Sequence, residues 1–421
     1  MKIEQLLIRE PFGSILEKTL TRFFSTYFET PFSVTWKKLN FLQLIGKSPS
    51  PGKEWFYCNP YLNIIYSAKA GDFVFSFLRE NYMHTPFPSR RLMQKIYVTL
   101  AANKYTARFF ATYLLEISPP IPDSSNLVIL GGNNRIRIVD LLEKRSWDVL
   151  KTGFDTAYIR AEVKARRREG TWPFPQLKIV AEDYSWFESE HIQAVSLNRL
   201  PGTKNNLKFL AEAFTFLCGW LEQSASVCGA FSYLDDLICE VEAACSGPLF
   251  SDSDRELVSH TLSSAQQILH RLSNKTGGPL IYLAEGHGDF QSGNILIDDN
   301  SAVWIVDWEH ARKRQIAYDY LVFFLQSRFP LGLSERIHTL LKSGDLILDG
   351  LPVVHDRVNE ILLDDDHRRI MLLLFVIEDL LWNVRENANH LFEVPSGAWL
   401  QYKREIIPAI KHIAEASSAQ I

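Results

Sequence analysis

The chain has 421 residues, of which 46% are hydrophobic and 22% are charged. This composition is typical of a globular protein with enough apolar material for two or three cores. The formal net charge of −4 argues against general nucleic-acid binding, which would need a surplus of positive charge. We therefore expect a globular protein without a nucleic-acid partner.

The charge is unevenly distributed along the chain. Residues 1–125 carry 15 basic and 9 acidic side chains, a local charge of +6, so the remainder carries −10. A basic N-terminal segment could face an anionic partner or a membrane surface. A solvated face with surplus lysine is the simpler interpretation.

The five cysteines form no CxxC pair, and four of them lie in apolar, helix-like sequence. This pattern is typical of reduced core residues in a cytoplasmic protein. The N-terminus interrupts its apolar residues with charges too early for a signal peptide. The most apolar window, 370–382, contains two acidic residues and is too short to span a bilayer.

Residues 1–118 are expected to form an extra N-terminal module of small α/β or α+β type. Its stretch 30–78 mixes aromatic and β-branched runs with Gly and Pro, and 89–115 has a helical pattern. In that helix Arg90, Arg91 and Lys95 could form an exposed basic face. The proline-rich stretch 119–125 predicts a linker. The module could mediate a protein or surface contact.

From residue 126 the pattern changes to short strands. The runs 126–130, 135–138, 147–150, 177–182 and 191–197 predict strands, and 154–168 predicts a helix. Residues 126–197 are therefore expected to form a sheet-rich lobe. Residues 198–421 are expected to form a helical lobe, with helices at 205–222, 231–244, 253–273, 318–328, 365–388 and 396–415 and a β-rich interruption at 286–308.

That interruption contains the strongest local signal, EGHGDFQSGNILI at 285–297 followed by VWIVDWE at 303–309. Asp289 lies between a glycine and an apolar strand, Asn294 follows five positions later, and Asp307 ends the next strand. Phosphoryl transfer needs a carboxylate to orient and deprotonate the attacking hydroxyl. It also needs oxygen ligands for magnesium, which an amide and a second carboxylate can supply.

The motifs HGDFQSGNIL and IVDWEHA resemble the signature of the aminoglycoside phosphotransferase/choline kinase family, small-molecule relatives of protein kinases. The resemblance implies an α+β, bilobal protein-kinase-like fold, with ATP or another NTP and Mg²⁺ as cofactors. It implies Asp289 as catalytic base, and Asn294 and Asp307 as metal ligands. It further implies that His287 braces the loop and that Asp319 caps the following helix. Family members usually have a glycine a few residues before that aspartate, which 312–315 lack.

A kinase-like upstream lobe should contain a glycine turn, a strand lysine and a helix glutamate. Lys151 ends a predicted strand and could reach the nucleotide phosphates, and Glu162 on the next helix could hold it extended; Glu143 and Glu169 are alternatives for that glutamate. Backbone N–H groups of the turn would approach the phosphates. The predicted nucleotide contacts are Gly131, Gly132, Asn133 and Lys151, with Ala194, Val195 and Ser196 at the lobe connection.

The helical lobe is expected to supply the pocket for the phosphate acceptor. A cationic acceptor would favour carboxylates with aromatic faces, although each of these side chains could equally lie on a solvated surface. Glu378 and Asp379 are consecutive helix positions and cannot share one face. The candidates are Glu309, Glu378, Asp379, Asn383, Trp308 and Trp382.

The predicted function is ATP-dependent phosphorylation of a hydroxyl on an amino alcohol, an aminoglycoside-like molecule or a sugar. One alternative is an inactive nucleotide-binding scaffold, which would be expected to lack at least one of Lys151, Asp289, Asn294 and Asp307. The other is a protein kinase, which would need a longer segment between Asp307 and the helix at Asp319.

Overall fold

The computed structural model describes residues 1–40, 49–83, 88–200, 203–276, 278–344 and 355–418. The chain divides into two compact units. The first comprises Met1–Arg168 and Pro175–Val195. The second comprises Glu169–Phe174 and Ser196–Ile421.

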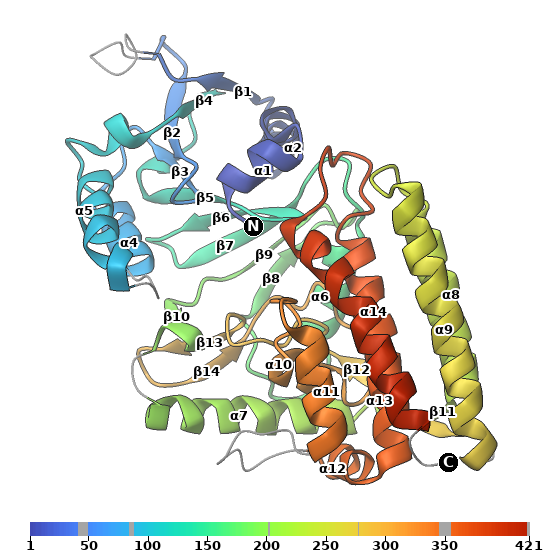
Figure 1. Ribbon diagram of the computed structural model, residues 1–421. Coiled ribbons are helices and arrows are strands. Elements are labelled where there is room, and N and C mark those ends of the chain that lie inside the picture. Colours follow the sequence, from blue (N-terminus) through green and yellow to red (C-terminus); the bar gives the residue numbers. More distant parts are fainter. Residues whose placement is uncertain (41–48, 84–87, 201–202, 277, 345–354, 419–421) are drawn as a thin grey trace. The chain divides into compact units, whose positions relative to one another are not determined.

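The first unit is built on one nine-stranded antiparallel sheet (Figure 1). Its strand order is β1-β4-β2-β3-β5-β6-β7-β9-β8. The strands are β1 (Ser33–Lys38), β2 (Glu54–Asn59), β3 (Ile64–Ser67), β4 (Tyr113–Ser118), β5 (Leu127–Gly131), β6 (Arg135–Asp140), β7 (Arg145–Leu150), β8 (Leu177–Val180) and β9 (Trp186–Glu190). β10 (Ala194–Ser196) lies where the first unit ends.

Successive side chains of a strand point to opposite faces of the sheet, and in this sheet both faces carry apolar side chains. Ile65 and Ile129 belong to a core with α1 (Ile3–Arg9) and α2 (Phe12–Tyr27). Their strand neighbours Tyr66 and Val128 belong to a second core with α4 (Asp72–Tyr82) and α5 (Arg91–Ala101). Helices therefore cover both faces, and α6 (Ala157–Arg166) follows β7.

The N-terminal residues differ from the expected separate module. β3 pairs with β5, so one continuous sheet runs across the predicted linker 119–125. The reason is that α1 and α2 bury their apolar side chains on strands from both sides of that linker, including Phe56 and Trp147. The predicted helix 89–115 is also shorter than expected, because 113–118 forms β4. Of the predicted strand 191–197, Ala194–Ser196 form β10, whereas β9 (Trp186–Glu190) was not predicted.

The second unit is mainly helical, as predicted. Its helices are α7 (Thr203–Glu222), α8 (Ala230–Cys245), α9 (Asp252–Thr276), α10 (Tyr318–Phe324), α11 (Leu333–Ser343), α12 (Asp356–Leu363), α13 (Asp365–Arg385) and α14 (Gly397–Ser418). α13 is buried along most of its length and packs against α8, α9, α12 and α14. α11 and α12 were not predicted.

Short strands in the second unit frame the motif region. β11 (Ser226–Gly229), β12 (Leu280–Gly286) and β15 (Arg312–Gln315) form one antiparallel sheet. β13 (Ile295–Asp298) and β14 (Val303–Ile305) form an antiparallel pair. The predicted β-rich interruption is thus present, and the segment carrying Asp289 connects β12 to β13.

Candidate active site

Asp289 lies in the loop between β12 and β13, which we call the Asp289 loop (residues 287–294). The Asp289 side chain is only 11% exposed. Oδ2 accepts hydrogen bonds from Gln291 Nε2 at 2.9 Å and from Asn294 Nδ2 at 3.0 Å. Oδ1 accepts a 2.6 Å hydrogen bond from Nε of Arg328. Both carboxylate oxygens are therefore held, which fixes the orientation of the side chain.

Asp319 holds the start of this loop from the first turn of α10. Its Oδ2 accepts from the backbone N–H of His287 at 2.6 Å, and its Oδ1 accepts from that of Gly288 at 2.8 Å. Gly288 has φ +88°, and a Cβ there would lie 2.3 Å from the carbonyl oxygen of His310. Only glycine fits this position. Asp319 was expected to cap α10; that helix begins after Ala317 without a side-chain cap, and the Asp319 carboxylate supports the Asp289 loop instead.

His287 joins the Asp289 loop to the segment that carries Asp307. Its ring is fully buried, Nδ1 accepts from the backbone N–H of Asp289 at 3.1 Å, and Nε2 lies 3.0 Å from the carbonyl oxygen of Val306. Since Nδ1 is an acceptor, the proton is on Nε2, which donates to Val306. The predicted bracing contact of His287 is therefore present in this geometry.

Asp307, which follows Val306, has a left-handed backbone conformation with φ +72°. This conformation is uncommon for a residue other than glycine and is enriched at functional sites. The backbone N–H of Val306 donates to the carbonyl of Asn294 at 3.0 Å. Asn294 directly precedes β13 and Asp307 follows β14 by two residues, so the pairing of these strands brings their backbones close together.

The residues present fit a magnesium ion. Asn294 directs its amide nitrogen to Asp289, with a second bond from Nδ2 to the Asp289 carbonyl at 2.9 Å. Its Oδ1 is then the end of the amide that could bind a hard cation. Magnesium commonly uses only one or two protein oxygens together with phosphates. No group of three or more His, Cys, Asp or Glu side chains suited to a metal occurs in the described ranges.

Arg328, which the sequence did not single out, is the main charged partner of Asp289. Its side chain is 6% exposed. Nη1 donates to Asp379 Oδ1 at 2.6 Å and Nη2 to the carbonyl of Gly288 at 2.7 Å. Burial alone would lower the pKa of Arg328, but Tyr318, Asp289 and Asp379 outweigh it and raise that pKa. Arg328 therefore stays charged between two buried carboxylates.

The acceptor candidates separate into two groups. The guanidinium carbon of Arg328 lies 3.8 Å from the ring centre of Trp382, whose indole N–H is buried and makes no hydrogen bond among the described residues. Nε2 of His310 lies 3.6 Å from Glu309 and 3.6 Å from Glu386. Burial lowers the pKa of His310 to about 4, so its ring is neutral at pH 7.

The other candidates have structural contacts instead. Glu378 is buried, accepts from Gln315 N at 3.1 Å and Nε2 at 3.2 Å, and is hydrogen-bonded by the Tyr233 hydroxyl. These contacts give Glu378 a structural role, and its predicted contact with the acceptor is not part of the proposal below. Trp308 is 2% exposed among aromatic rings. Asn383 donates to the carbonyl of Asp379 within α13.

In the first unit, Lys151 has an unexpected acidic partner. Its ammonium is fully buried, 2.6 Å from Oε1 of Glu10 and 2.6 Å from the carbonyl of Asn133. Glu10 follows α1, and burial raises its pKa despite Lys151. The predicted partner Glu162 is also buried and forms ion pairs with Arg135 at 3.4 Å and Arg166 at 3.3 Å.

The predicted glycine turn is closely packed by the same N-terminal segment. A Cβ on Gly131 would lie 2.6 Å from Cγ1 of Ile3, and one on Gly132 would lie 2.6 Å from the Arg135 carbonyl. Arg9 donates to Oδ1 of Asn133 at 2.8 Å. At the predicted lobe connection, 194–196 form β10, in which Val195 is 42% exposed. Gly131 and Gly132 are therefore required for the close packing of this turn.

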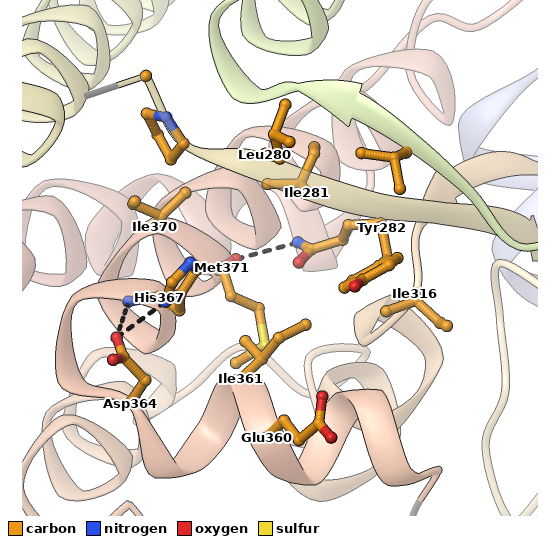
Figure 2. A pocket seen from close by; sticks show the side chains of 14 residues that line it. Leu280, Ile281, Tyr282, Ile316, Glu360, Ile361, Asp364, His367, Ile370 and Met371 are labelled. Atoms are coloured by element: carbon orange, nitrogen blue, oxygen red, sulfur yellow. Dashed lines mark hydrogen bonds and ion pairs between the residues drawn. The ribbon is translucent and has the colours of Figure 1, made fainter. Parts of the chain in front are cut away.

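A cavity of about 640 Å³ lies elsewhere in the second unit (Figure 2). Its lining is mostly apolar, and Figure 2 shows His367 hydrogen-bonded to Asp364 at its edge, 2.9 Å between Nδ1 and Oδ1. Gln315 also lines it and donates to the carbonyl of Met371. The lining residues do not include the Asp289 loop, so this cavity is separate from the site above.

No family model and no curated protein matches the chain. Similar solved structures include a choline kinase from Streptococcus pneumoniae (14% identity, 70% of this chain and 92% of that one, TM-score 0.40). Others are a Plasmodium vivax ethanolamine kinase (10%, 82% and 94%, 0.43) and an aminoglycoside phosphotransferase in complex with ADP and hygromycin B (17%, 70% and 95%, 0.42). With identities below 25% and TM-scores below 0.5, these likenesses alone assign no function to the chain.

Proposed function

We propose that this chain transfers the γ-phosphoryl group of ATP to a hydroxyl of a small molecule, with Asp289 as the base. The observation that carries the proposal is the connection of three groups through one framework. Asn294 donates to Asp289, and His287 links the Asp289 backbone to the carbonyl before Asp307. A carboxylate base beside an amide and a second carboxylate is the set that phosphoryl transfer requires.

In this mechanism Asp289 orients the acceptor hydroxyl and removes its proton as attack proceeds. The new bond forms between the hydroxyl oxygen and the γ-phosphorus, and the bond from that phosphorus to the β,γ-bridging oxygen breaks. Asn294 Oδ1 and the Asp307 carboxylate would hold magnesium, which supplies positive charge to the phosphates. Arg328 and Gln291 keep the Asp289 carboxylate in place, so less orientational freedom is lost in the reaction.

Residues of the first unit are assigned to the nucleotide. The proposal retains Lys151, Gly131, Gly132 and Asn133 as contacts to the nucleotide phosphates. It retains 194–196, where the first unit ends and the second continues, as contacts to the adenine. Glu10 is added as the carboxylate that positions the Lys151 ammonium, since it lies 2.6 Å away. Glu162 supports the same unit through Arg135 and Arg166.

The acceptor is assigned to the second unit, near Glu309 and Trp382. Arg328 already covers one face of the Trp382 ring, so that face is occupied by an internal cation. The Trp382 indole N–H can donate to a hydroxyl oxygen, and a carboxylate such as Glu309 can accept from a hydroxyl or ammonium group. An amino alcohol, an aminoglycoside-like molecule or a sugar satisfies this chemistry.

Two alternatives are less well supported. An inactive scaffold would be expected to lack part of the catalytic set, yet Lys151, Asp289, Asn294 and Asp307 are all present. A protein kinase would need a long peptide-docking segment after the metal carboxylate. Here β15 begins at Arg312 and α10 at Tyr318, directly after Asp307.

A phosphate-transfer screen tests the proposal. Purified protein is incubated with magnesium and ATP labelled on the γ-phosphate, together with amino alcohols, aminoglycosides, nucleosides and sugars. Labelled product with at least one acceptor, absent without magnesium, is the expected result. Nucleotide binding without transfer to any acceptor would favour the scaffold, and label found only on added polypeptides would favour the protein kinase.

A further inference from the structure

Helix α5 (Arg91–Ala101) has an apolar outer face in addition to its buried one. Val98 and Ala101 face the core of the first unit. The outer positions Leu92, Met93, Ile96 and Leu100 are 68%, 70%, 47% and 43% exposed. At 100° per residue these four positions fall within an arc of about 100° on one side of the helix. We call this arc the outer face of α5.

The sequence around the outer face is strongly basic. Residues 81–115 contain no Asp or Glu, but they include Arg90, Arg91, Lys95, Lys104 and Arg108. Arg91 and Lys95 are exposed and one helical turn apart, beside the apolar arc. Neither forms an ion pair within the part of the chain that the structure describes. Their positive charge is therefore available to an external anion.

The segment after α5 extends the same combination of side chains. Tyr105 and Phe109 are 72% and 53% exposed. Each has a cation over its ring, Lys104 Nζ at 5.1 Å and the Arg108 guanidinium at 5.0 Å from the ring centre. The short helix containing Phe109 (Ala107–Phe110) packs against α5. Figure 1 shows α5 beside α4 at the left edge of the view.

We propose that the outer face of α5, with Tyr105 and Phe109, binds the surface of a membrane that contains anionic lipids. Exposed aliphatic and aromatic side chains flanked by Lys and Arg characterise helices that lie in the headgroup region of a bilayer. A nucleic acid would use the cations but would leave the aliphatic arc exposed. Four large aliphatic side chains exposed on one side of a single helix are more than the scattered apolar residues of an ordinary protein surface.

The attraction to anionic lipids would come from the basic residues around α5 and not from the protein as a whole, since the whole chain carries a net charge of −4. It requires no membrane-spanning segment, and no helix in the described ranges is long and apolar enough to cross a bilayer. The inference is independent of the phosphotransfer proposal, since none of these residues belongs to the proposed site. It gives the N-terminal part of the chain a role in bringing the protein to a lipid surface.

Vesicle sedimentation of the full-length protein tests the inference. We expect the protein to sediment with phosphatidylcholine–phosphatidylserine vesicles at low salt and much less with pure phosphatidylcholine, and high salt should weaken the binding. Leu92→Gln with Ile96→Gln should weaken binding by about tenfold or more, because the apolar contact is lost. Arg91→Gln with Lys95→Gln should abolish most of the preference for phosphatidylserine.

A matched control changes two exposed leucines elsewhere, Leu142→Gln with Leu363→Gln, which are 49% and 80% exposed. This variant should bind vesicles like the unchanged protein, and all variants should keep their unfolding temperature because the side chains are exposed. Absence of sedimentation with phosphatidylserine vesicles, or equal binding by all variants, would overturn the inference. Self-association without vesicle binding, lost in Leu92→Gln with Ile96→Gln, would also overturn it and identify an interface between copies.

Discussion

The Nε atom of Arg328 lies 2.6 Å from Oδ1 of Asp289. The same guanidinium donates to Asp379 Oδ1 at 2.6 Å and to the Gly288 carbonyl at 2.7 Å. Arginine can satisfy such a planar set of acceptors, whereas lysine offers only a point charge. The proposed base is therefore fixed by a cation that is itself anchored on α13.

Removing the Arg328 guanidinium should lower the turnover rate more than it weakens substrate binding. We expect Arg328→Met to lower kcat by about 10- to 100-fold, because a misplaced base loses the geometry that transfer needs. Arg328→Lys should recover only part of the rate. Steady-state kinetics check this, with Arg404→Met, an exposed change on α14, as the control. A normal kcat in folded Arg328→Met would show that the ion pair does not position Asp289.

Asn294 should affect the metal requirement of the reaction. We expect Asn294→Ala to raise the magnesium concentration for half-maximal activity by about tenfold or more, because an oxygen ligand is lost. Asn300→Ala, in the exposed turn between β13 and β14, is the matched control. Magnesium titrations of both variants measure the effect. An unchanged magnesium dependence in Asn294→Ala would contradict its assignment as a ligand.

The buried pair of Lys151 and Glu10 should matter for both folding and nucleotide binding. Removing one partner leaves a buried charge without compensation, which typically costs about 3–5 kcal/mol in free energy of unfolding. We therefore expect Glu10→Gln and Lys151→Met each to be destabilised, and the double variant to regain part of the loss. Chemical denaturation of the three variants measures this.

The nucleotide affinity of the double variant separates the two roles of Lys151. Glu10→Gln with Lys151→Met removes both charges, so loss of nucleotide binding by this folded protein would reflect the missing phosphate contact. We expect its dissociation constant for ATP to rise by about tenfold or more. Unchanged ATP affinity would leave Lys151 with a structural role only.

Glu378 should make stability depend on pH in the acid range. Burial raises its pKa from 4.5 to about 6, so the folded protein binds its proton more tightly than the unfolded chain. The resulting stabilisation is fully present below pH 4.5 and is lost as the pH rises through about 6. The free energy of unfolding relative to Glu378→Gln should therefore fall across this interval. A difference in free energy of unfolding that stays constant from pH 4.5 to 7 would contradict a raised pKa of Glu378.

The elements closest to the chemistry were predictable because their signals are local. Asp289, Asn294 and Asp307 lie within 19 residues, next to short apolar runs that predict strands. Most helices of the second unit were likewise predicted, because their apolar positions repeat with the period of a helix. The predicted support from His287 and Asp319 depends on backbone contacts inside the same short region.

The contacts that sequence reasoning missed join distant parts of the chain. Arg328 is 39 residues from Asp289, and Glu10 is 141 residues from Lys151. Neither residue lies in a motif, and a charged residue in a helix-rich sequence usually indicates a solvated surface. The separate N-terminal module was expected for a similar reason, since strand pairing across 119–125 leaves no local pattern.

Substitution of the proposed base tests the central claim most directly. Asp289→Asn keeps the shape of the side chain but removes the carboxylate that would accept the hydroxyl proton. With an acceptor identified by the screen, we predict that this variant still binds ATP with magnesium and transfers phosphate at least about 1,000-fold more slowly. Transfer to that acceptor at a rate near that of the unchanged protein would contradict Asp289 as the base.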